Sequence, residues 1–176
     1  MSGTGRQLPS GVETRALGLE DVDAVAALIA ACDRTYLDWA PGWDPPEESE
    51  ERAKWTQRLS SGDGWTLGAF EGEKLVGMVM AEQAMAGDDG PHHPDRGHLR
   101  SLFVDPSHWR EGIGGELLSR AERAMLELGY KTAELETPEA APARQLYERA
   151  GWTVLGHQGR HKRLGLPMVK YEKALS

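Results

Sequence analysis

The stretch from Leu102 to Leu118 constrains the possible fold more than any other part of the chain. A short apolar segment, Leu102–Val104, ends at Asp-Pro, and three glycines (Gly112, Gly114 and Gly115) then open an amphipathic segment. This order predicts a strand, a loop and a helix. Glycines at a helix start let the backbone come close to a ligand, and the free N–H groups there attract anions together with the helix dipole. The stretch therefore predicts a pocket for a phosphate-bearing ligand.

Length, charge and cysteine content restrict the class of protein. The 176 residues fit one domain, which we expect at residues 11–176 after a disordered tail at residues 1–10. No apolar run is long enough to cross a membrane, and the N-terminus lacks the pattern of a secretory signal. A net charge of −8 argues against nucleic acid as a partner and suits a cationic substrate, although acidic solubility explains it as well. The single cysteine, Cys32, fits a reducing cytoplasm.

The spacing of apolar residues predicts alternating strands and helices. Strands are predicted at residues 12–17, 65–70, 75–83, 98–104, 131–137, 152–157 and 166–174. Helices are predicted at residues 22–32, 47–59, 114–128 and 142–150, with loops at 36–46 and 84–97. The predicted fold is α/β (α+β): a mixed, mostly antiparallel sheet of six or seven strands, flanked by about four helices, with one central parallel β-α-β crossover.

Two nucleotide-binding patterns fail at the glycine loop. A dinucleotide fold needs Gly-x-Gly-x-x-Gly directly after a strand, but Leu117 stands at the third glycine position and seven residues separate Val104 from Gly112. A nucleoside triphosphate loop needs Gly-Lys-Ser/Thr, which is absent. A purely structural loop does not explain three glycines at one helix start.

Two motifs on opposite sides of a predicted strand carry a family resemblance. Residues 109–114, Trp-Arg-Glu-Gly-Ile-Gly, are similar to the pyrophosphate loop (Gln/Arg)-x-x-Gly-x-(Gly/Ala). Residues 140–152 are similar to Asn-x-x-Ala-x-x-Leu-Tyr-Glu-x-x-Gly-aromatic. With these motifs and the order of elements, nearly the whole chain resembles the GCN5-related N-acetyltransferases (GNATs). Trp109 departs from the first motif and Ala140 from the second.

The resemblance implies acetyl-CoA as co-substrate, with no metal, and an acetyl group transferred directly to a primary amine. Backbone groups of the strand would hold the pantetheine arm and polarise the thioester carbonyl, and the loop would hold the pyrophosphate. The cofactor-binding residues implied are Leu102, Phe103, Val104, Arg110, Glu111, Gly112, Ile113, Gly114 and Gly115.

The reaction needs an acid for the departing thiolate and a base for the amine. Tyr147 matches the tyrosine acid of the family. The family's glutamate base would fall at Leu135, so Glu136, next to it, is the candidate that we carry forward, and Glu134 is the other flanking carboxylate. His98, Glu82 and a water relay are alternatives.

The acceptor half of the site is less strongly indicated. Tyr36 and Trp39 lie where the family forms its acceptor pocket, although they fit equally well as small-core aromatics. The Glu-rich run from Asp44 to Arg52 is interpreted as an acidic helix start. His92, His93, Asp95 and His98 lack metal-ligand spacing.

We therefore expect a cytoplasmic N-acetyltransferase for a small-molecule amine, with no nucleic-acid or membrane partner. Two alternatives remain open: acetylation of a protein N-terminus or lysine, and a non-catalytic acyl-CoA-binding sensor. A homodimer is compatible with the family.

Overall fold

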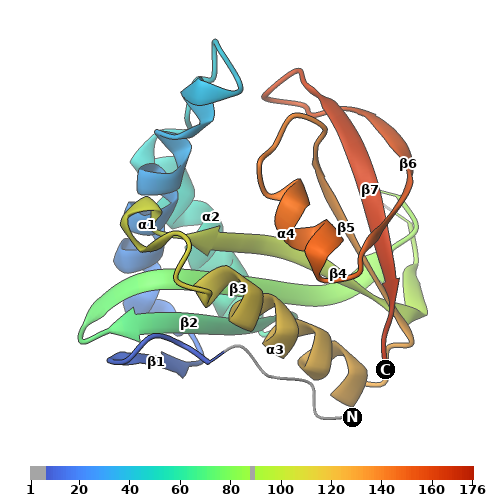
Figure 1. The fold of residues 1–176 in the computed structure, drawn as a ribbon, viewed down its shortest axis with the longest axis horizontal. Helices are drawn as coiled ribbons and strands as arrows, with labels where there is room; N and C mark the ends of the chain where they lie inside the picture. Colours follow the sequence, from blue (N-terminus) through green and yellow to red (C-terminus); the bar gives the residue numbers. More distant parts are fainter. Residues whose placement is uncertain (1–6, 88–89) are drawn as a thin grey trace.

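The computed structural model describes residues 7–87 and 90–176 (Figure 1). Its sheet has the strand order β1-β2-β3-β4-β5-β7-β6, and every neighbouring pair is antiparallel except β4 and β5. The predicted fold class is thus confirmed, including the single parallel crossover. The strands are β1 (Val12–Arg15), β2 (Trp65–Glu71), β3 (Lys74–Met85), β4 (His92–Val104), β5 (Thr132–Pro138), β6 (Thr153–Arg160) and β7 (Pro167–Ala174).

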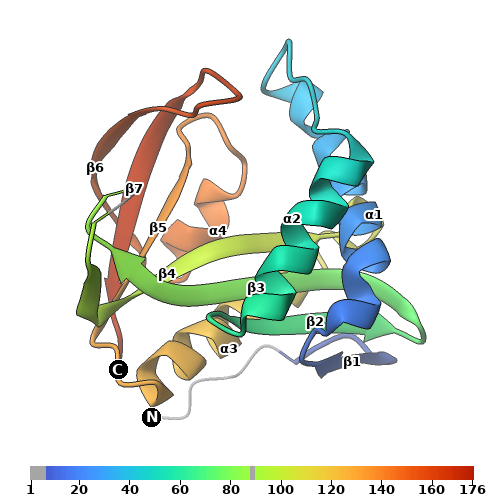
Figure 2. The ribbon, with the colours of Figure 1, turned by 180° about the vertical axis from the view of Figure 1, so that it is seen from behind.

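Helices cover both faces of the sheet. The α-helices are α1 (Val22–Asp33), α2 (Glu48–Ser61), α3 (Ile113–Glu127) and α4 (Arg144–Arg149), and short 3-10 turns lie at η1 (Leu19–Asp21), η2 (Tyr36–Asp38) and η3 (Pro106–His108). Helices α1 and α2 lie side by side on one face (Figure 2), and α3 and α4 lie on the other (Figure 1).

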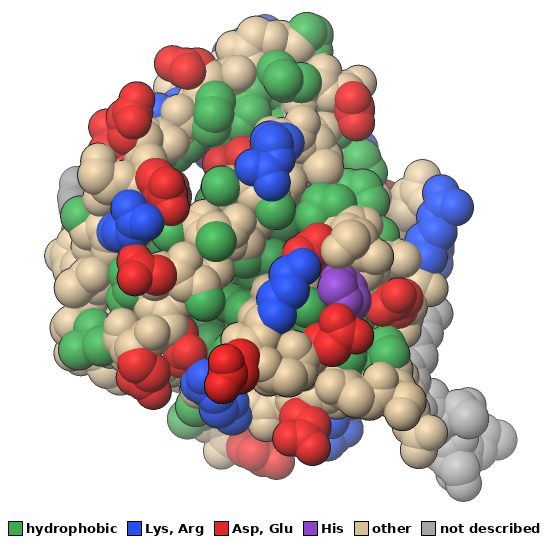
Figure 3. Space-filling model, turned by 90° about the vertical axis from the view of Figure 1, so that its left-hand side faces the viewer, with side chains coloured by type: hydrophobic (Ala, Val, Ile, Leu, Met, Phe, Trp, Pro, Cys, Tyr) green, Lys and Arg blue, Asp and Glu red, His purple; other side chains and the backbone are tan. Residues whose placement is uncertain are grey.

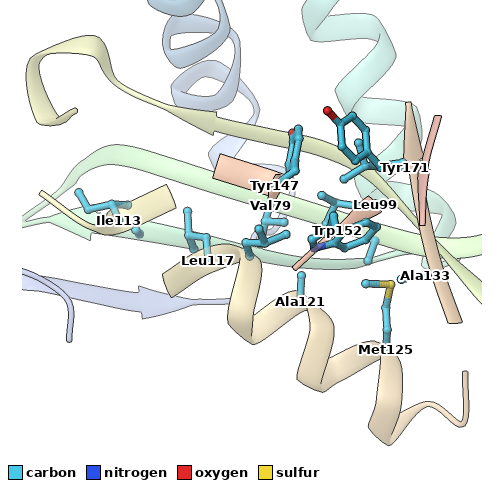
Figure 4. Packing of buried hydrophobic residues seen from close by; sticks show 14 of the residues in the cluster. Val79, Leu99, Ile113, Leu117, Ala121, Met125, Ala133, Tyr147, Trp152 and Tyr171 are labelled. Carbon is cyan, nitrogen blue, oxygen red and sulfur yellow. The ribbon is translucent and has the colours of Figure 1, made fainter. Parts of the chain in front are cut away.

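Each face has its own core. On the α3 side, Leu117, Ala121 and Met125 pack against strand residues, with Tyr147 and Trp152 completing the cluster (Figure 4). On the α1 side, α1 residues such as Val25 and Ile29 pack on β3 together with Trp55 of α2. Successive side chains of β4 point to opposite faces of the sheet, so the residues at the end of this strand pack into different cores. Leu102 and Val104 face the α3 side, and Phe103 faces the α1 side.

Strands β4 and β5 pair over only three residues and then separate. Arg96–His98 of β4 are in register with Thr132–Glu134 of β5, but β4 runs on to Val104 and β5 to Pro138 without further pairing (Figure 1). Strand β5 instead follows β7 along its whole length. From Leu99 onward, the edge of β4 that faces β5 is therefore left without a strand partner.

A buried carboxylate ties the strands together at the point where β4 and β5 are still paired. The carboxylate of Glu134 on β5 lies 3.0 Å from the guanidinium of Arg96 on β4 and 3.0 Å from Nζ of Lys170 on β7, and its other oxygen lies 3.7 Å from Nδ1 of His98. Burial by itself raises the pKa of Glu134, but hydrogen bonds from His98, Lys170 and Arg96 outweigh it and lower that pKa to about 2. Glu134 thus ties three strands together as a fixed anion.

Two predicted boundaries are corrected. Most of the loop predicted at 84–97 is strand, because β3 extends to Met85 and β4 begins at His92, across a pairing irregularity between Gln83 and Met85. Polar residues conceal these strand ends in the sequence, since backbone pairing rather than an apolar face defines them. The predicted helix at 142–150 is shorter, Arg144–Arg149. Of the expected tail, residues 1–6 lie outside the described residues.

Candidate active site

The loop between β4 and α3 is anchored to the end of β4. Trp109 donates a hydrogen bond from Nε1 to the carbonyl oxygen of Val104 at 2.8 Å. Asp105 accepts from the backbone N–H of Ser107 at 2.9 Å and lies 2.9 Å from Nζ of Lys74. Trp109, which departs from the family motif, therefore fixes the loop through its indole group.

The backbone of this loop is bent to present the start of α3. Arg110 has φ +67° and Gly112 has φ +88°, both in the left-handed region. From Ile113 onward, Glu116 is the first residue whose backbone N–H is bonded within the described chain, and it donates to the carbonyl of Gly112. The N–H groups of Ile113, Gly114 and Gly115 have no acceptor in the described part of the chain, and free donors of this kind at a helix start attract anions, so we call this the anion-binding end.

Gly114 brings this loop close to α4. A Cβ atom at Gly114 would lie 3.3 Å from Leu146 of α4 and 3.5 Å from Val104 of β4. The anion-binding end, the end of β4 and the helix that carries Tyr147 therefore meet at one place. The side chain of Ile113 is buried in the core, so only its backbone faces this place.

Tyr147 projects from α4 into an apolar environment. Its ring centroid lies 6.4 Å from that of Trp152 and 6.1 Å from that of Tyr171, and its hydroxyl points away from α3 (Figure 4). Burial raises the pKa of Tyr147 to about 12, with a smaller contribution from Tyr171. The phenol is thus a proton donor that stays protonated at every physiological pH.

The candidate bases differ sharply in their surroundings. Glu134 is held as an anion by three cationic or polar partners, so it has little tendency to accept a proton. Glu82 is paired with Arg100. Glu136 is exposed and has no ion-pair or hydrogen-bond partner among the described residues. It lies on the opposite face of β5 from the buried Leu135.

Aromatic side chains gather at the turn after α1. The ring centroid of Tyr36 lies 4.9 Å from that of Trp39 and 5.6 Å from that of Trp43. Burial raises the pKa of Tyr36, and the neighbouring acidic groups Asp33, Cys32, Tyr147 and Glu51 add to the effect. This cluster thus lies within electrostatic range of Tyr147, and the two predicted acceptor residues are in contact with each other.

Sequence reasoning missed two acidic residues beneath this cluster. Asp33 at the end of α1 and Glu51 of α2 are buried, with 7% and 5% of their surface exposed. The acidic helix start interpreted at residues 44–52 is confirmed, since Glu48, Glu50 and Glu51 lie in the first turn of α2, but Glu51 is buried whereas the other two are exposed. Helical spacing offered a signal, since Glu51 precedes the fully buried Trp55 by one turn.

The comparisons with known proteins decide the family. A model of the acetyltransferase (GNAT) family matches residues 29–152, well over half of the chain. The protein belongs to the GNAT family. A Mycobacterium tuberculosis protein named "Probable N-acetyltransferase" is 32% identical over 126 residues, and the match spans 64% of this chain and 64% of that GNAT relative.

Solved GNAT structures share the fold. A GNAT-family protein from Desulfovibrio desulfuricans superposes with a TM-score of 0.74 at 20% identity, covering 94% of this chain and 99% of that one. The PaiA N-acetyltransferase of Thermoplasma acidophilum, solved with coenzyme A, gives a TM-score of 0.70 at 19% identity, over 93% of this chain and 98% of that one. A Salmonella typhimurium structure with acetyl-CoA gives 0.69 at 18% identity, over 95% of each chain.

Asp33→Asn is expected to stabilise the protein at neutral pH. Burial and the charge of Glu51 raise the pKa of Asp33 from 3.8 to about 6, so its ionisation disfavours the folded state once the pH exceeds these values. At about 1.4 kcal/mol per pKa unit, the variant should gain roughly 1–3 kcal/mol of unfolding free energy at pH 7.5. The gain should vanish below about pH 4, where both states are protonated.

Urea denaturation of both proteins at pH 7.5 and pH 4 measures this difference. Asp38→Asn is the control, because Asp38 carries the same charge on an exposed 3-10 turn. Equal stability of Asp33→Asn and the parent protein at pH 7.5 would show that the Asp33 carboxylate is not destabilising.

Proposed function

We propose that the protein transfers the acetyl group of acetyl-CoA to the primary amine of a small molecule. One observation carries this proposal. The unpaired N–H groups at the start of α3 and the helix that carries Tyr147 lie beside the end of β4, where that strand has no partner on the β5 side. This arrangement offers an anion site, a free strand edge and an acid for one extended thioester substrate. Membership of the GNAT family supports the same reading.

The cofactor-binding residues would each act through a different kind of group. The N–H groups of Ile113, Gly114 and Gly115 would receive the pyrophosphate, helped by the exposed Arg110. Gly112 and Glu111 would contribute backbone alone. The free edge of Leu102–Val104 would pair with the pantetheine arm, and one of its N–H groups would polarise the thioester carbonyl. Charges of both signs are scattered over this end of the molecule (Figure 3), so backbone groups rather than a basic surface would carry phosphate binding.

The chemical step forms a C–N bond and breaks a C–S bond. The neutral amine attacks the thioester carbonyl carbon, and the tetrahedral intermediate collapses with departure of the CoA thiolate. Tyr147 would donate its proton to that sulfur. An amine with a pKa near 10.4 must first lose a proton, which costs about 4–5 kcal/mol at pH 7. We assign proton removal to Glu136, acting directly or through water, because its carboxylate is exposed and unpaired among the described residues.

The acceptor side supports a small substrate. Tyr36, Trp39 and Trp43 form an aromatic wall after α1. The turn between β6 and β7 reaches across to this region, where Arg163 donates to the carbonyl of Asp44 at 3.2 Å and lies 3.4 Å from Glu50. This bridge would narrow the route by which an acceptor reaches the aromatic wall, whereas a protein acceptor needs an open groove there.

A screen of amines with acetyl-CoA tests the proposed function. Thiol release is followed for small primary amines, for peptides with free N-termini and for lysine peptides. Acetylation of small amines with at least tenfold higher kcat/KM than any peptide is the expected result. Preference for peptides would replace the proposal with a protein acetyltransferase, and acetyl-CoA binding without turnover of any acceptor would indicate a sensor.

Tyr147→Phe should lower kcat by about 10²–10⁴-fold, the usual contribution of acid–base groups, and leave the KM for acetyl-CoA nearly unchanged. Because the phenol pKa is about 12, the loss should be uniform from pH 6 to pH 9. Steady-state kinetics across this pH range measure the effect. An unchanged kcat for Tyr147→Phe would remove the acid assignment.

Glu136→Gln should lower kcat as well, with its largest effect at low pH, where less amine is neutral. Steady-state kinetics over the same pH range measure this effect.

Gly114→Glu should abolish acetyl-CoA binding while the fold persists. The new side chain would place a carboxylate at the anion-binding end, and its Cβ would be tight against Leu146 at 3.3 Å. Calorimetry with acetyl-CoA measures the affinity. Gly114→Ala is the control for steric effects, since it adds the Cβ without charge. Normal affinity in the Glu variant would place the pyrophosphate elsewhere.

A further inference from the structure

A cavity lies between α1 and α2, under the loop that joins them. Its volume is about 230 Å³, and its lining includes Ala26 and Ala30 of α1, Pro45 of the loop, and three side chains with chemical character: Asp33, Trp43 and Glu51. The alanines leave room where larger residues would close the space between the helices. The cavity is therefore a space with mainly apolar walls and two buried carboxylates.

The carboxylates lack the partners that buried charges need. Glu51 has one oxygen 2.5 Å from Nζ of Lys54, and its other oxygen, Oε2, is buried without any hydrogen-bond partner. Asp33 receives no hydrogen bond from a described residue. Buried carboxylates are normally paired, because an unpaired buried charge is costly. This site is thus incomplete in the protein by itself.

Asp33 is the carboxylate of the site that has no direct counter-charge. Lys54 pairs with Glu51, and Glu48, which also lines the cavity, pairs with Arg52. Asp33 has no ion-pair partner among the described residues, and the charges of Lys54 and Arg163 act on it only without contact. The ring of Trp43 offers a face over which an ammonium group is favoured.

Contacts at the end of α1 and in the turn after it link this cavity to the reaction site. The ring of Trp43, which lines the cavity, lies 5.6 Å from that of Tyr36. Cys32, next to Asp33 in α1, donates a hydrogen bond from Sγ to the carbonyl of Val104 at 3.3 Å, so this end of α1 lies against the end of β4. A single small molecule that extends past Tyr36 would reach both places.

We propose that this cavity binds a second, non-reacting ammonium group of the acceptor, so that the acceptor is a diamine or another amine with a second cation. The inference rests on the proposed function, because it names the substrate class of that site. The reacting amine itself does not suit the cavity. Two carboxylates would stabilise its protonated form, which cannot attack the thioester. A second ammonium group that does not react keeps its proton, so the same two carboxylates favour its binding.

Two acceptors that differ only in the second charge measure how much that charge contributes to kcat/KM. 1,4-Diaminobutane and n-pentylamine have the same length and differ at one end, where the diamine has an ammonium group and the monoamine a methyl group. The parent protein should acetylate the diamine with at least tenfold higher kcat/KM. In Asp33→Asn and Glu51→Gln this ratio should fall to within about threefold, while the KM for acetyl-CoA stays unchanged. Glu127→Gln, an exposed carboxylate of α3, should keep the ratio of the parent.

A binding measurement separates this inference from the proposed function. Calorimetric titration of the parent protein with 1,4-diaminobutane, without acetyl-CoA, requires no turnover. Binding of the diamine that both cavity variants weaken at least tenfold supports the cavity even if no amine is acetylated. Equal acetylation of diamine and monoamine, or a diamine preference that both variants retain, would overturn the inference and leave the proposed function standing. Absence of diamine binding at millimolar concentration would overturn it too.

Discussion

The ion-paired joint at Glu134 is the constraint on which the candidate site depends. Arg96, Lys170 and His98 hold this buried carboxylate, and they come from the strands on either side of it. The joint fixes β4 and β5 over three paired residues, after which the strands separate and leave the end of β4 unpaired. An unpaired strand edge inside a sheet exposes N–H and C=O groups that another extended molecule can use. We therefore propose the separation as the binding feature for the thioester substrate, with Glu134 stabilising it rather than taking part in proton transfer.

The two faces of the sheet divide the chemistry between them. On the α3 side, α3 and α4 supply the anion-binding end and the phenol of Tyr147, which stays protonated in its apolar environment. On the α1 side, the aromatic wall and the cavity with Asp33 and Glu51 face the proposed acceptor. We expect Asp33 to lower the stability of the free protein at neutral pH, because burial raises its pKa to about 6. A residue that destabilises the free protein can be retained when it contributes to ligand binding.

The sequence carries stronger signals for the proposed cofactor side than for the acceptor side. The glycines and Asp105-Pro106 act through local backbone geometry, so nearby residues are enough to recognise them, and the motif around Tyr147 is recognised through the family resemblance. The buried pair Asp33 and Glu51 depends on the packing of two helices that are separated by fourteen residues, from Arg34 to Glu47. The polar start of β4, residues 92–97, resembles a loop in the sequence, because pairing with distant backbone rather than an apolar pattern defines it as strand.

By itself, the sequence determined the order of strands and helices along the chain and the glycine-rich start of α3, because both follow from short-range rules, and the family resemblance supplied the candidate acid. Only the tertiary structure decided which carboxylates are fixed and which are available. Glu134 and Glu136 are two residues apart on one strand, yet the first is held by three partners from β4 and β7 while the second is exposed. The reason is physical: the protonation and reactivity of a carboxylate depend on its burial and on nearby charges, and these come from parts of the chain that lie far away in sequence.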